Sequence, residues 1–196
     1  MAYDKAAVEL FGAFARLNFK EDTMGKDYLA TLNPEPRAIF QAFLYECVAQ
    51  GLPMLVHSGL RSLEDQARLY RRSRSPLQVG HKVDELREAG FGFLADKLES
   101  VGPQPTGPWA TNAAPGESWH NYGMAIDAVL LVDGKPDWNT NFMPKWHQVG
   151  GIAVKHGLEW AGNWKKSQEF VHFQAGKGNN PLNNLTPEQA RKLLGV

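Results

Sequence analysis

The sequence predicts an α+β fold, because helical and strand patterns alternate along one chain of domain size. Several stretches place apolar residues three or four positions apart, which is the spacing of one face of a helix. Three shorter stretches, 54–56, 123–132 and 170–173, are apolar runs of strand length. At 196 residues the chain fits one ordinary domain, so we expect a single domain over 1–196.

Two helices are predicted before the first strand. A stripe of apolar residues over 3–17 predicts an amphipathic helix. Asn33-Pro34 supplies an N-cap followed by proline in the first turn, so a second helix begins there, and Gly51 ends it. Cys47 lies on the apolar face of this helix and has no second cysteine to pair with. We interpret it as a buried apolar residue and not as a nucleophile.

After the strand at 54–56 the sequence predicts one capped helix and then a stretch of interrupted helical patterns. Ser62, three positions before Asp65, predicts the N-cap of another helix. Over 71–111 short helical patterns are interrupted by prolines and glycines, which break regular structure. We interpret 71–111 as an insertion or a lid.

The last third of the chain predicts two helices around a short strand. A helix over 144–156 ends at Gly157, which suits a left-handed C-cap. The strand at 170–173 follows. Thr186-Pro187-Glu188-Gln189 then resembles a capping box that opens a final helix.

Composition limits the kinds of partner. Hydrophobic residues make up 43% of the chain and charged residues 21%, which is typical of a folded globular protein. The 21 basic residues balance 21 acidic ones, so no net positive field attracts phosphates, and we expect no nucleic-acid partner. No apolar run reaches the ~18 residues of a membrane span, and the start lacks a signal-peptide pattern. We therefore expect synthesis in the cytoplasm, no stable membrane insertion and a monomer.

The strand at 123–132 contains one charged residue, Asp127, which needs a compensating cation because a buried unpaired carboxylate loses its hydration. An arginine partner is one explanation. His120, in the loop before the strand, offers another, since imidazole and carboxylate both bind zinc. Glu169 and His172 stand three positions apart near the next strand, where an ideal strand would turn them to opposite faces. We therefore expect Glu169 in the preceding loop.

Two histidines and one carboxylate can form a catalytic zinc site. Such a set leaves the fourth tetrahedral position for water, whereas structural sites use four protein ligands. A further carboxylate nearby can accept the proton of that water. This pattern assigns zinc to His120, Asp127 and His172 and the role of base to Glu169, although E-x-x-H pairs alone are common by chance.

A ten-residue motif carries a family resemblance. Ser118-Trp119-His120-Asn121-Tyr122-Gly123-Met124-Ala125-Ile126-Asp127 matches S-x-H-x-x-G-x-A-x-D. It resembles the signature of D-alanyl-D-alanine carboxypeptidases and L-alanyl-D-glutamate endopeptidases, a group that includes VanY-type peptidases and phage endolysins. Segments 58–62 with Gln66, 157–160 and 169–174 agree in the same order, so the resemblance covers roughly 32–174, with 71–111 fitting poorly.

The resemblance implies the hedgehog/DD-peptidase fold, in which helices cover a small antiparallel sheet and a zinc cleft lies at the sheet's edge between the two motif strands. It implies the same zinc ligands, His120, Asp127 and His172, and Glu169 as the catalytic base.

The resemblance also implies substrate-binding residues. Arg61, in the S-G-x-R-S segment, is expected to bind substrate and to stabilise the developing oxyanion, for which a fixed guanidinium is well suited. A surface ion pair is the alternative for Arg61. Gln66 and Ser118 are expected to contact substrate as well. Asn163 stands where many endolysins of this group carry an acidic residue in W-G-G-D-W, which leaves the substrate preference open.

The implied function is hydrolysis of the stem peptides of bacterial peptidoglycan. The bond is either L-Ala–D-Glu or D-Ala–D-Ala, and the missing signal-peptide pattern favours a lytic endopeptidase released by a holin; a secreted antibacterial effector is the other route. A non-catalytic zinc-binding module, as in hedgehog domains, is the alternative of a different class. The presence of Glu169 beside a full ligand set argues for catalysis.

Overall fold

The computed structural model describes residues 27–105, 107–139 and 143–196. The predicted helix over 3–17 lies outside these residues. The chain divides into two compact units. Among the described residues, we call them the sheet unit, over 27–60 and 123–177, and the helical unit, over 61–122 and 178–196. The expectation of one domain over the whole chain stays a prediction.

A small antiparallel sheet forms the centre of the sheet unit, which confirms the predicted α+β class. Its strands among the described residues are β1 Met54–Ser58, β2 Ala125–Val132, β3 Lys135–Asp137, β4 Glu159–Trp160 and β5 His172–Gln174. Their order is β1-β2-β5-β4, with β3 paired to β2. The motif strands β2 and β5 are therefore inner neighbours. The zinc site was expected at the sheet's edge between these two strands, and the edge position is wrong. The apolar residues on both faces of β2 suit an inner strand.

Two helices begin and end where local signals predict. Helix α3, Pro34–Ala49, has proline in its first turn, and the chain turns at Gly51 with φ +71°. Helix α7, Met143–Lys155, is followed by Gly157 with φ +78°. Both glycines adopt the left-handed conformation that other residues rarely take.

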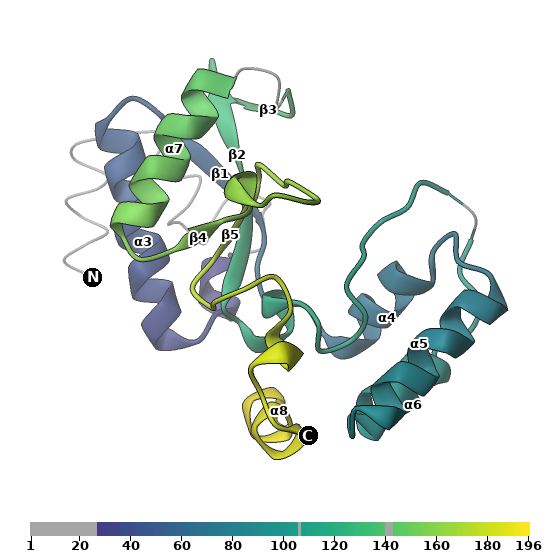
Figure 1. Ribbon diagram of the computed structural model, residues 1–196. Helices are drawn as coiled ribbons and strands as arrows, with labels where there is room; N and C mark the ends of the chain where they lie inside the picture. Colours follow the sequence, from purple (N-terminus) through teal and green to yellow (C-terminus); the bar gives the residue numbers. More distant parts are fainter. Residues whose placement is uncertain (1–26, 106, 140–142) are drawn as a thin grey trace. The chain divides into compact units, whose positions relative to one another are not determined.

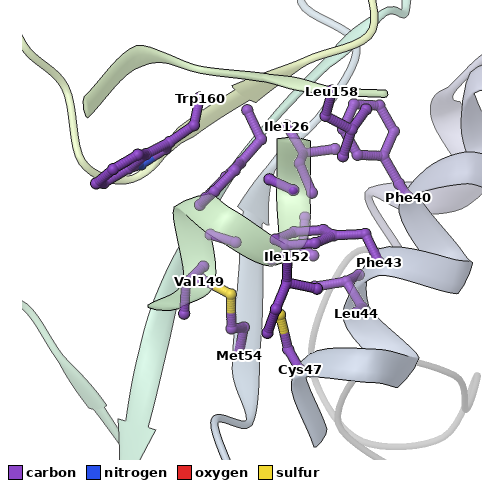
Figure 2. Packing of buried hydrophobic residues seen from close by; sticks show 14 of the residues in the cluster. Phe40, Phe43, Leu44, Cys47, Met54, Ile126, Val149, Ile152, Leu158 and Trp160 are labelled. Atoms are coloured by element: carbon purple, nitrogen blue, oxygen red, sulfur yellow. The ribbon is translucent and has the colours of Figure 1, made fainter. Parts of the chain in front are cut away.

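The core of the sheet unit lies where α3 and α7 pack side by side against the sheet (Figure 1). Alternate residues of β2, namely Ile126, Ala128 and Leu130, face this core, as strand geometry requires. Figure 2 shows the packed side chains of both helices and the strands: Phe40, Phe43, Leu44, Cys47, Met54, Ile126, Val149, Ile152, Leu158 and Trp160. Cys47 is fully buried as predicted, and burial raises the pKa of its thiol to about 12, with a smaller contribution from the charge of Glu46.

Trp160 is held between two glycines. A Cβ atom at Gly150 would lie 2.0 Å from Cε3 of Trp160, and one at Gly162 would lie 2.2 Å from Cζ2. Only glycine therefore fits at either position without a shift. The indole Nε1 donates to the carbonyl of Phe170 at 2.8 Å, so this packing holds the segment that leads into β5.

Short helices build the helical unit. They are α4 Leu63–Arg71, α5 Pro76–Glu88, α6 Gly92–Ser100 and α8 Pro187–Leu194. The predicted caps are confirmed: the Ser62 hydroxyl accepts from the amide of Asp65, and Thr186 forms a capping box with Gln189. A second apolar cluster, with Leu94 and Leu98 at its centre, packs these helices together.

Helices α5 and α6 fall within 71–111, as the interrupted helical patterns predicted. The interpretation of this stretch as an insertion or a lid stays a prediction. Over the described ranges, none of the helices has the length and apolar character needed to cross a membrane.

Candidate metal centre

Strand pairing brings Asp127 and His172 together. The two residues are direct partners in the antiparallel register of β2 and β5, and directly opposed residues point to the same face of a sheet. Asp127 Oδ1 lies 3.1 Å from His172 Nδ1. The backbone register alone therefore places the imidazole of His172 against the carboxylate of Asp127.

His120 lies on a short 3-10 helix, Trp119–Tyr122, that leads toward β2. It is buried, and its carbonyl accepts from the amide of Arg61 at 3.0 Å. His120, Asp127 and His172 each offer one ligand atom, and these atoms lie within 4.8 Å of one another. Of the described residues, these three form a group that could bind a metal, as the sequence predicted.

The donor set of this group fits zinc. Two imidazoles and one carboxylate are the ligands of many catalytic zinc sites. Two nitrogen or oxygen ligands of one tetrahedral zinc lie about 3.3 Å apart, since each bond is about 2.0–2.1 Å long. The 3.1 Å between Asp127 Oδ1 and His172 Nδ1 is close to this separation. These two side chains are thus already placed to share one ion.

The electrostatic surroundings of His172 suit a cation. Burial, the largest single effect, lowers the pKa of this imidazole, while the hydrogen bond and the charge of Asp127 raise it. A hydrogen bond to Gln174 and the charge of Glu169 act in the same direction. The pKa of His172 is therefore raised above its usual value, because its surroundings favour positive charge.

Glu169 lies in the loop before β5, as predicted from its spacing to His172. Its carbonyl accepts from the amide of His172, and its own amide donates to Ala161, both at 3.3 Å. Its side chain is exposed, and its charge contributes to the raised pKa of His172. A water-accessible carboxylate thus adjoins a metal-ligating candidate, while its role as a base stays a prediction.

The three predicted substrate-binding residues lie in the helical unit. Arg61 Nη1 donates to Oε1 of Gln66 at 3.0 Å, so the structure brings these two together. Gln66 is fully buried, and its amide donates to the carbonyl of Ala113 at 2.7 Å. The hydroxyl of Ser118 accepts from the amide of His120 at 3.4 Å. Gln66 and Ser118 therefore have positioning contacts, and contact of any of the three with substrate stays a prediction.

Sequence reasoning missed a contact of Gln174. Its Oε1 lies 3.0 Å from Nε2 of His172. Residues two apart on a strand share a face, so the spacing from His172 was the signal that could have identified it. Asn163, where the family resemblance implied an acidic residue, is exposed on a 3-10 helix, Ala161–Asn163.

Comparison with known proteins finds a family match for one segment of the chain. Residues 111–175 match the family described as D-alanyl-D-alanine carboxypeptidase. The match contains the three ligand candidates and Glu169, and it confirms the resemblance that the ten-residue motif suggested.

One curated relative is the peptidoglycan L-alanyl-D-glutamate endopeptidase CwlK of Bacillus subtilis. The two are 35% identical over 101 residues, which cover 47% of this chain and 60% of CwlK. The chain thus matches less than two thirds of the length of this relative.

Solved structures of peptidoglycan peptidases are more distant. The L-Ala D-Glu endopeptidase ChiX of Serratia marcescens is 18% identical with a TM-score of 0.43, over 76% of this chain and 84% of that protein. The LD-carboxypeptidase LdcB is 20% identical with a TM-score of 0.48, over 90% of this chain and 74% of that protein.

Proposed function

We propose that this chain is a zinc-dependent peptidase that cuts the stem peptides of bacterial peptidoglycan, and that its preferred bond is L-alanyl–D-glutamate. The observation that carries the proposal is the convergence of His120, Asp127 and His172 within 4.8 Å, with the Glu169 carboxylate in the adjoining loop. The similarity to CwlK, an enzyme named for this bond, supports the choice of substrate.

The three ligand candidates would hold the ion through two nitrogens and one oxygen. A zinc ion in such a site polarises a carbonyl and lowers the pKa of water. Asp127 and His172 need little movement to bind, because strand pairing already fixes their separation. This arrangement leaves room in the coordination shell for water or substrate, as catalytic sites do.

Glu169 would move the proton. As an exposed carboxylate it can accept a proton from the attacking water and return it to the leaving amine. Its backbone bonds to Ala161 and His172 fix the position of the loop. The carboxylate therefore needs only side-chain rotation to adjust to a substrate.

Arg61 would stabilise negative charge on the tetrahedral intermediate. Its guanidinium is held by the buried amide of Gln66, so less conformational freedom is lost when substrate binds. A planar, permanently charged donor of this kind suits a developing oxyanion.

A second candidate reaction is removal of the terminal D-alanine of the stem peptide. The description of the matched family, D-alanyl-D-alanine carboxypeptidase, favours it. For cellular context we propose that the protein reaches peptidoglycan after release from the cytoplasm, through a holin or as a secreted antibacterial effector. It would act as a monomer.

Mass spectrometry of digested peptidoglycan tests the function and names the bond. Purified sacculi are incubated with the zinc-loaded protein, with chelator-treated protein and with the Glu169→Gln variant. New C-terminal L-alanine and N-terminal D-glutamate residues, formed only by the zinc-loaded protein, would support the endopeptidase activity. Release of single D-alanine residues instead selects the carboxypeptidase. Intact sacculi with a fully zinc-loaded protein would refute both.

A further inference from the structure

Gln174 sits at the centre of a chain of side chains that crosses three strands. Glu159 on β4 and Gln174 on β5 are register partners, and so are His172 on β5 and Asp127 on β2. All four side chains share one face of the sheet, since residues two apart on a strand point the same way. Hydrogen-bond contacts run without a gap from Glu159 to Gln174, from Gln174 to His172 and from His172 to Asp127.

The orientation of the Gln174 amide is determined by its surroundings. Its nitrogen Nε2 donates to Oε2 of Glu159 at 3.0 Å and to the carbonyl of Gly176 at 3.0 Å. Both partners are acceptors, so a flipped amide would set oxygen against oxygen. The side chain is 1% exposed, and a buried polar atom without a partner is costly. The oxygen Oε1 must therefore face His172.

This orientation determines which nitrogen of His172 carries a proton. The amide oxygen can only accept, so Nε2 of His172, 3.0 Å away, must donate. A neutral imidazole has one N–H and one lone pair. In a neutral ring with the proton on Nε2, the lone pair is on Nδ1, which would then face an ion shared with Asp127 Oδ1, 3.1 Å away. Without an ion, the hydrogen bond between these two atoms requires a proton on Nδ1 as well.

We propose that Gln174 is a positioning residue that, oriented by Glu159 and Gly176, holds His172 in the Nε2–H tautomer and so presents Nδ1 to the metal. The inference rests on the proposed zinc site but not on peptidase activity. Partners of this kind that act on a metal ligand typically change metal affinity about 10–100-fold when removed.

A small neighbour leaves space for this arrangement. Ala125 is the register partner of Gln174 on β2, and it is fully buried. Because its side chain is a single methyl group, it leaves room on this face for the Gln174 amide to lie beside the imidazole of His172.

Zinc affinity of the full chain, measured by competition with a chromophoric chelator, tests the proposal. Gln174→Leu removes the acceptor and should weaken zinc binding about 10–100-fold. The matched control is Glu159→Gln, whose amide oxygen still accepts from Gln174, so its affinity should stay near that of the unaltered protein. Unchanged affinity in a folded Gln174→Leu variant would overturn the proposal.

A second measurement needs no variant, in case Gln174→Leu does not fold. Nitrogen-15 NMR of the zinc-loaded protein, labelled at histidine, reports which ring nitrogen of His172 is protonated. A proton on Nε2 and none on Nδ1 is expected, and the reverse would refute the proposal. Failure of the proposed function is distinguishable, because a protein that binds zinc with this tautomer but cuts no peptidoglycan would refute only the peptidase activity.

Discussion

The sheet unit and the helical unit position their candidate functional residues by different means. In the sheet unit, strand register sets Asp127 opposite His172, and a tightly packed core holds the strands. In the helical unit, Arg61 is held by a side-chain contact to Gln66 near a helix N-terminus. Register cannot shift by one residue without turning every side chain to the other face, whereas a helix cap and a hydrogen bond are individually replaceable. The comparison teaches that the paired candidate ligands of the sheet unit, Asp127 and His172, tolerate less change around them than Arg61 does.

The largest effect is expected from Asp127→Ala. The change removes a candidate ligand and the carboxylate that lies opposite His172. The protein should therefore lose most of its zinc and its activity. Metal analysis of purified protein, compared with a His81→Ala control at an exposed histidine, measures this. Full zinc occupancy in the Asp127→Ala variant would mean that the ligand set is wrong.

Glu169→Gln separates proton transfer from metal binding. The amide is nearly the same size but cannot accept a proton, so activity should fall on the order of a hundredfold or more while zinc content stays the same. Turnover on muropeptides, measured at equal zinc content, tests it. If the variant works within a few-fold of the unaltered protein, Glu169 is not the base.

Arg61→Lys tests whether Arg61 takes part in catalysis or only in substrate binding. Lysine keeps the charge but loses the planar fork. If Arg61 stabilises the oxyanion, kcat and kcat/KM should fall together. The fall should correspond to a rise of roughly 2–4 kcal/mol in the activation free energy, the scale of one oxyanion donor. Steady-state kinetics on a soluble muropeptide measure both constants. A raised KM with unchanged kcat would show that Arg61 grips substrate equally in the ground and transition states.

Local and periodic signals in the sequence predicted much of the fold. The caps at Ser62 and Thr186, the strand around Asp127 and the loop position of Glu169 all depend on neighbours in the chain, and the structure confirms each. The order of the strands was harder to predict from the sequence, because strand pairing joins residues that are far apart in the chain. The expected edge position of the metal group was therefore wrong, since periodicity does not tell which strands flank β2.

The contact of Gln174 with His172 was hidden for a related reason. The role of a glutamine in a short strand cannot be inferred until its partner on β4, Glu159, is known. The cross-strand partner, and not the residue itself, determines how the amide is turned. Sequence reasoning therefore predicted the three candidate ligands, whereas the residues that orient them required the structure.

Gly150→Ala tests how strictly the sheet unit is packed. The added Cβ would lie 2.0 Å from the Trp160 ring, and overpacking of this kind typically costs about 1–3 kcal/mol. Gly151→Ala, the next residue of α7, is the matched control, because a Cβ there meets nothing within 4 Å. It should be neutral or stabilising by up to about 1 kcal/mol, since alanine favours a helix. Chemical denaturation of both variants measures the difference, and equal stabilities would show that Trp160 moves aside freely.

The smallest effect is expected from the helix cap in the helical unit. The Ser62 hydroxyl accepts from the Asp65 amide at 3.0 Å at the start of α4, and loss of such a cap typically costs about 0.5–2 kcal/mol. Ser62→Ala should therefore lower the free energy of unfolding by this amount, while Ser62→Asn, which can still cap, should lower it far less. Because Ser62 follows Arg61, the same pair of variants also shows whether the cap helps to orient the guanidinium. If Ser62→Ala raises KM and Ser62→Asn does not, the start of α4 positions Arg61. Unchanged kinetics in both variants would indicate that Gln66, and not the helix cap, orients the Arg61 guanidinium.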